Sequence, residues 1–171
     1  MSQNPFLSLS GNPKWENLKP DHIRGDITQA LEKAENNLQK IRDLQPDETT
    51  FSNTVKALEH ASEDLYYAWG LITHLDSVCN SPELREAHNE MLPAVSAFGA
   101  KITLDPQLWD TLQAFSKREE ADSLSPIDQR LLNETLLDFQ EAGADLTEDQ
   151  RLRLEQISQE LAQVTQKFSE Q

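Results

Sequence analysis

The sequence predicts an all-α fold: about six helices, mostly long and antiparallel, packed as a helical bundle with no sheet. Apolar residues recur at spacings of three and four along most of the chain, as they do on one face of an α-helix. No segment shows the apolar–polar alternation of a β-strand, and prolines stand where the helical patterns begin. At 171 residues the chain is long enough for one domain with one core, so we assign residues 1–171 to a single helical domain.

Two helical patterns occupy the first half of the chain, behind residues 1–18, which we expect to form an extended segment. The first covers residues 20–44 and has apolar positions at Ile23, Ile27, Leu31, Ala34, Leu38 and Ile41. The second continues from a threonine cap through residues 51–78, and we expect one long helix there. Gly70 weakens that helix by about 1 kcal/mol relative to alanine, and we expect it to mark a close helix crossing.

Four more helical patterns follow in the second half. The first contains Pro93, which removes a backbone hydrogen bond, so we expect a kink at that residue. The polar segment 116–125 separates the second pattern from the third and is predicted to be a loop. The four patterns cover residues 82–102, 106–115, 126–142 and a final stretch from Thr147 onwards.

The residues that these patterns single out are structural, because each begins or ends a helix. Serine or aspartate followed by proline suits a helix start, since the side chain can cap the helix and the proline needs no hydrogen-bond partner. Glycine suits the left-handed position after a helix, and a T-x-x-Q sequence forms a capping box. The set of helix caps and starts is Pro20, Ser81, Pro82, Asp105, Pro106, Ser125, Pro126, Gly143 and Thr147.

One stretch, HLDSVCNSPELREAHNEMLP (residues 74–93), concentrates two histidines, the only cysteine and four carboxylates. H-E-x-x-H is absent from the chain, and no histidine has a glutamate three residues before it, as helical di-iron sites require. We therefore predict no catalytic, metal-binding or cofactor-binding residue and interpret the stretch as a corner between two helices. His60 and Asp64 are expected to form a surface ion pair, His74 to interact with the last carbonyls of its helix, and Cys79 to be inert.

Composition limits the partners. The 30 acidic and 15 basic residues give a formal charge of −15, which would repel nucleic acid and anionic lipid. One cysteine cannot form an intramolecular disulfide, and the N-terminus lacks a signal-peptide pattern. No window approaches the roughly 20 apolar residues of a membrane span. We expect a cytoplasmic protein that binds neither nucleic acid nor membrane.

Residues 74–93 also resemble a segment near the N-terminus of the thimet-oligopeptidase-like zinc metallopeptidases, the family of oligopeptidase A and peptidyl-dipeptidase. Asp76 stands where that family has an asparagine after His-Leu. Four further segments resemble the family in order along the chain. They are Asn4-Pro5-Phe6-Leu7, Lys19-Pro20-Asp21-His22-Ile23, LNETLLDFQEAGADL and Phe168-Ser169.

The resemblance implies a function that composition does not show. Family members are several times longer, and their H-E-x-x-H motif, with its downstream glutamate ligand, lies far C-terminal to any residue here. The resemblance therefore implies an N-terminal domain, truncated before the catalytic domain, that forms a wall of a channel admitting short peptides. It implies zinc in the full-length parent protein, where a zinc-activated water hydrolyses oligopeptides, and no cofactor or peptidase activity in this fragment.

The resemblance implies two partners, the missing C-terminal catalytic domain and, in the parent protein, short peptide substrates. Truncation would leave apolar surface exposed, so we also expect the fragment to associate with a second copy of itself. The chain stops at Gln171 without a helix-closing signal, so we expect it to end inside a longer protein. The alternative is a free-standing helical interaction module that presents an apolar groove to a partner helix. A ferritin-like metal protein is a third class, but it needs carboxylate–histidine pairs.

Overall fold

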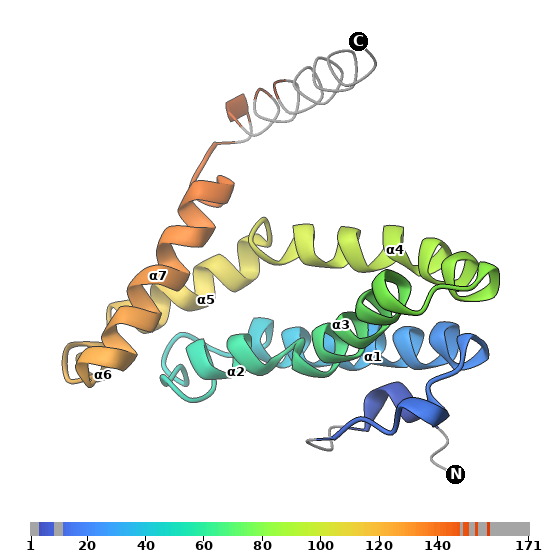
Figure 1. Ribbon diagram of the computed structural model, residues 1–171. Helices are drawn as coiled ribbons and strands as arrows, with labels where there is room; N and C mark the ends of the chain where they lie inside the picture. The colour runs from blue at the N-terminus through green and yellow to red at the C-terminus, as the bar shows by residue number, and fades with distance from the viewer. Residues whose placement is uncertain (1–3, 9–11, 148, 151–152, 154–156, 158–171) are drawn as a thin grey trace.

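The computed structural model describes residues 4–8, 12–147, 149–150, 153 and 157 of the chain (Figure 1). Over these residues the fold is helical and contains no strand. The prediction of an all-α fold is confirmed, and the pattern predicted from Thr147 onwards lies largely outside the described residues. The elements are the 3₁₀ turns η1 (Pro5–Leu7) and η2 (Trp15–Asn17) and the helices α1 (Pro20–Arg42), α2 (Val55–His60), α3 (Glu63–Val78), α4 (Pro82–Ile102), α5 (Pro106–Ser116), α6 (Glu119–Asp122) and α7 (Pro126–Ala142).

The core lies where α1 packs against α3 and α4. Helix α3 runs antiparallel to both α1 and α4 (Figure 1). The α1 side chains that face this core repeat at helical spacing, so one face of the helix is buried and the other is polar. The buried apolar residues of α1 are Ile23, Ile27, Ala30, Ala34, Leu38 and Ile41.

The prediction of one helix through residues 51–78 is wrong, because the chain breaks between α2 and α3. Ala61 and Ser62 are buried at the break, and the Ala61 N–H donates to the Leu58 carbonyl at 3.1 Å. The Asn37 side-chain amide, from α1, donates to the Ala61 carbonyl at 3.2 Å. A side chain of α1 thus provides a hydrogen-bond donor for the backbone carbonyl of Ala61, which lies outside both helices at the break.

Residues 1–18, expected to be extended, contain the two 3₁₀ turns in their described part. Phe6 is fully buried, and η1 contacts both α1 and α3. The turn therefore exists because burial of one large aromatic side chain draws the segment onto the helices.

The 116–125 segment, expected to be a loop, contains the single helical turn α6. Ala121 is buried within it, and the Phe51 N–H donates to the Glu120 carboxylate at 3.1 Å. Arg118 donates to the carbonyls of Pro46 and Asp47 at 3.2 and 2.8 Å. The turn is held by contacts with the segment that precedes α2, which no local pattern could reveal.

Helices α3 and α4 approach closely at Gly99, and the prediction of a close crossing at Gly70 is wrong. A Cβ atom on Gly99 would lie 2.9 Å from the Tyr66 hydroxyl, whereas one on Gly70 would have no atom within 4 Å. Helix α4 continues through Pro93, and the kink expected there stays a prediction. None of the described helices is long and apolar enough to cross a membrane.

Candidate functional site

The residues singled out from the sequence lie at separate helix ends and form no common site. The side-chain oxygens of Ser81, Asp105 and Ser125 accept hydrogen bonds from backbone N–H groups two or three residues further on, at 2.9 to 3.2 Å. These bonds satisfy donors that the first turn of a helix leaves without partners. The first residues of the four helices that begin with proline are Pro20, Pro82, Pro106 and Pro126.

Gly143 and Thr147 lie at the end of α7 and just beyond it. Gly143 has φ of 95°, a left-handed conformation in which its N–H reaches back to the last carbonyls of α7. The Thr147 N–H donates to the Gln150 side chain at 2.9 Å, and the Gln150 N–H donates to Thr147 Oγ1 at 3.4 Å. The two residues form the reciprocal bonds of a capping box.

The ligand-rich stretch 74–93 forms the corner between α3 and α4. The His74 ring packs against Trp15, with centroids 5.7 Å apart, and the His88 ring stacks on Trp69 at 4.7 Å and 16°. The described part of the chain contains no group of three or more His, Cys, Asp or Glu side chains that could hold a metal ion. The histidines therefore join the N-terminal segment to α3, and α3 to α4.

The expected ion pair between His60 and Asp64 is wrong. His60 Nδ1 lies 3.2 Å from a Glu63 carboxylate oxygen, while Asp64 pairs with Lys33 of α1. The break at Ser62 lies between His60 and Asp64, so the two residues do not share the face of one continuous helix.

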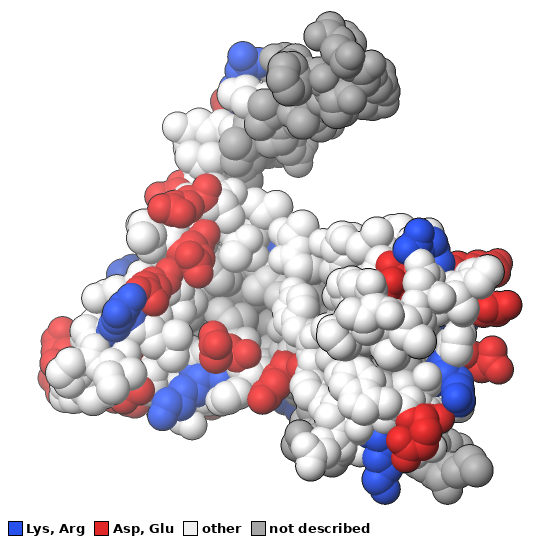
Figure 2. Space-filling view, viewed as in Figure 1, with Lys and Arg blue, Asp and Glu red and all other residues white. Residues whose placement is uncertain are grey.

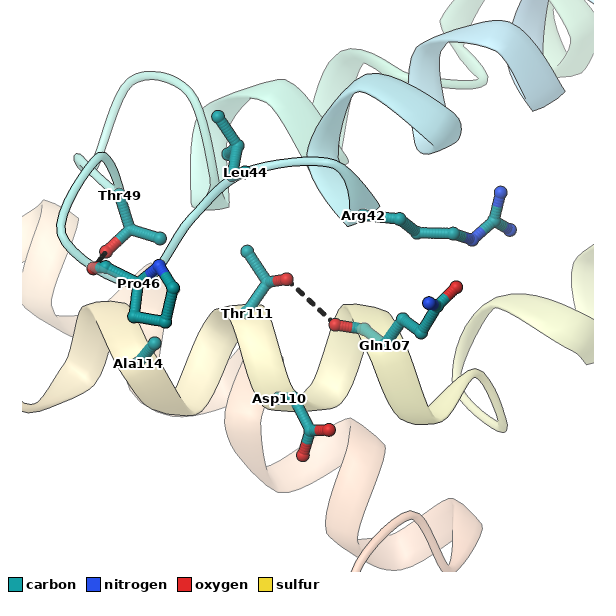
Figure 3. Close-up of a pocket in the computed structure, with 8 residues that line it drawn as sticks. All are labelled: Arg42, Leu44, Pro46, Thr49, Gln107, Asp110, Thr111 and Ala114. Carbon is teal, nitrogen blue, oxygen red and sulfur yellow. Dashed lines mark hydrogen bonds between the residues drawn. The ribbon is translucent and has the colours of Figure 1, made fainter.

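A polar cavity of about 210 Å³ lies between the end of α1, the loop after it and α5 (Figure 3). Arg42 is its cationic group, but Nε and Nη1 donate to Asp105 at 2.7 Å and to Glu35 at 2.8 Å. Burial acts to lower the Arg42 pKa, and these bonds outweigh it, so the net direction is upward. Thr49 and Thr111 donate to backbone carbonyls. The cation and the two threonine hydroxyls of the cavity are thus engaged by the protein itself.

Asp26 on α1 is the one carboxylate among the buried residues of the described structure. It is 2% exposed and accepts a hydrogen bond from the Phe6 N–H at 2.8 Å. Burial raises the pKa of this carboxyl, and the Phe6 bond and the charge of His22 oppose that shift without cancelling it. The carboxylate anchors η1 to α1, and no substrate-facing role follows from its position.

We expect Asp26→Asn to remove a pH-dependent penalty without releasing η1. Because the folded pKa is raised above the unfolded value near 3.9, the contribution of Asp26 to stability is present below that value and lost as the pH rises through the folded pKa. Urea unfolding should therefore show that the free energy of unfolding of Asp26→Asn increases relative to that of wild type as the pH rises through this window. Asp26→Ala is the control: it leaves the Phe6 N–H without its acceptor and should lose about 1–3 kcal/mol. If the difference in unfolding free energy between Asp26→Asn and wild type did not change with pH, this account would be contradicted.

In the described structure, the polar groups singled out above cap, pair and pack helices, as the parts of a helical domain do. The family model for the N-terminal domain of neurolysin and thimet oligopeptidase matches residues 26–151, most of the chain. The chain belongs to this family, and the resemblance drawn from its sequence is confirmed.

The curated relatives extend the match over nearly the whole chain. Oligopeptidase A of Haemophilus influenzae is 28% identical over 97% of this chain and 24% of the relative. The probable cytosolic oligopeptidase A of Arabidopsis thaliana is 29% identical over 99% of this chain and 24% of the relative. Dipeptidyl carboxypeptidase of Escherichia coli is 23% identical over 99% of this chain and 25% of the relative. The chain spans about a quarter of the length of these relatives.

Proposed function

We propose that this chain is the N-terminal domain of a cytoplasmic oligopeptidase, in which it forms one wall of a channel that restricts entry to short peptides. The observation that carries the proposal is the match of 97% of the chain to a quarter of oligopeptidase A. The described residues offer no set of ligands for the zinc of such an enzyme. Zinc and the catalytic residues would belong to the rest of the parent protein, and this chain alone would not cleave peptides.

The packing of the domain suits a rigid wall. Helix α1 is buried along one whole face against α3 and α4, and close-packed helices deform little. A folded protein would have to unfold before entering a narrow channel, at a cost of about 5–15 kcal/mol, whereas a short peptide has no such fold to lose. The formal charge of −15 would favour basic peptides near the entrance.

The proposal is tested on the full-length gene product. We expect it to hydrolyse short unstructured peptides, to lose that activity with a zinc chelator and to regain it when zinc is restored. A folded protein that contains the same peptide sequence in its interior should stay intact, and the 171-residue chain should cleave neither. Absence of chelator-sensitive cleavage by the full-length product would overturn the proposal, and so would peptidase activity in the 171-residue chain.

A further inference from the structure

Beyond Glu63 in its first turn, the outward face of α3 is uncharged in a chain of net charge −15. No charged residue occurs from Leu65 to Leu75, although this stretch is most of a surface helix. Its buried side holds Leu65, Ala68 and Ile72. The opposite side exposes Tyr66, Gly70, Thr73 and Ser77, at spacings of four, three and four. We call these four residues the α3 face.

Large aromatic and apolar side chains are exposed within the α3 face and at its borders. Tyr66 is 46% exposed and lies beside Gly99 of α4, and Val78, at the end of α3, is 65% exposed. Trp15, also 46% exposed, lies against His74, so it extends the same region. Figure 2 shows a broad uncharged surface over α3, with acidic and basic side chains around it.

The exposed apolar residues of α7 have a different setting. Ile127 and Leu137 are more exposed than Tyr66, but they share their helix surface with the exposed carboxylates Glu134, Asp138 and Glu141. Covering that surface would remove several charges from water, which is costly unless each is paired. The four residues of the α3 face carry no charge, and Tyr66 within it and Trp15 beside it are aromatic side chains of the kind enriched in protein interfaces.

We propose that the α3 face is the surface on which the rest of the parent protein docks. This inference rests on the proposed function, in which the chain is one quarter of a longer peptidase. About three quarters of each relative lies outside the aligned region, so a large partner on the same polypeptide would be available to cover the exposed surface. Glycine, threonine and serine along the α3 face leave room for another backbone to approach α3 closely.

The test compares two exposed glycines that have no atom within 4 Å of their Cβ positions. Gly70→Arg places a long charged side chain at the centre of the α3 face. Gly25→Arg, the matched control, makes the same change on the outward side of α1, between Arg24 and Asp26 in sequence. Arginine favours helix more than glycine does, so neither variant should lower the urea midpoint of the 171-residue chain.

In the full-length gene product, we expect Gly70→Arg to increase the initial rate of cleavage by thermolysin within residues 1–171 at least tenfold, and Gly25→Arg to leave it unchanged. Equal rates in both variants and wild type would overturn the docking proposal. The docking proposal would also be overturned if Gly70→Arg abolished dimers of the 171-residue chain but left the proteolysis rate of the full-length protein unchanged. That result would assign the α3 face to a second copy of the chain. A raised KM for peptides without faster proteolysis would assign it to substrate instead. Proteolysis does not depend on catalysis, so an inactive full-length protein would overturn the proposed function alone.

Discussion

We expect Phe115→Ala to lower the free energy of unfolding by about 3–5 kcal/mol, measured by urea denaturation of the 171-residue chain. Phe115 of α5 is fully buried, and its ring centroid lies 6.1 Å from that of Phe51, in the segment before α2. Helix α5 also contacts α1 and α7. Truncation would remove the burial of a whole aromatic ring and leave a cavity that rigid helices on several sides cannot close.

Ile127→Ala is the matched control for that loss. Ile127 is a large apolar residue of α7, but it is 81% exposed, so its truncation should change stability by no more than about 0.5 kcal/mol. Equal losses in the two variants would mean that Phe115 is not held in a packed core, and they would contradict the described arrangement of α5.

The helices themselves were predictable because their signal is local. In α1, apolar residues at helical spacing mark the buried face, and nearly all of them are buried in the structure. Helix starts were equally local, since serine or aspartate before proline both caps the first turn and suits proline's fixed φ. The sequence pattern alone, without any tertiary contact, identified Ser81, Asp105 and Ser125 as helix caps.

The departures come from contacts between residues far apart in sequence. At the break between α2 and α3, the Ala61 carbonyl accepts a hydrogen bond from Asn37, which is 24 residues away in sequence. The α6 turn is held partly by the bond between Glu120 and the Phe51 N–H, 69 residues apart. A single sequence carries no pattern for either contact, so one long helix and one loop were the expected structures.

At the candidate site, the corner between two helices was predictable. The Ser81-Pro82 sequence in residues 74–93 indicated a helix start, and the structure places the end of α3 and the start of α4 there. The stack of His88 on Trp69 was missed, because it joins faces of two helices whose relative rotation the sequence does not specify. The run from Leu65 to Leu75 has no charged residue in the sequence, but its exposed side and its core side become distinct only when α3 packs against its neighbours.

We expect Asp105→Ala to lower the free energy of unfolding by about 2–4 kcal/mol, because it removes two interactions at once. The Asp105 carboxylate accepts the N–H groups of Gln107 and Leu108 at the start of α5. Its second oxygen accepts from Arg42 Nε at 2.7 Å, and the Arg42 side chain is only 11% exposed. The variant would leave a largely buried guanidinium with Glu35 as its remaining carboxylate partner. Urea denaturation at constant pH measures the loss.

Two further variants separate the cap from the ion pair. Asp105→Asn keeps a side-chain oxygen for the cap and removes the charge, so its loss should be smaller than that of Asp105→Ala. Arg42→Met combined with Asp105→Ala removes both charges, and the double variant should be more stable than the sum of the single losses predicts, by about 1–3 kcal/mol. That coupling measures how far the end of α1 and the start of α5 depend on one ion pair. Strictly additive losses would show that Asp105 acts only as a helix cap.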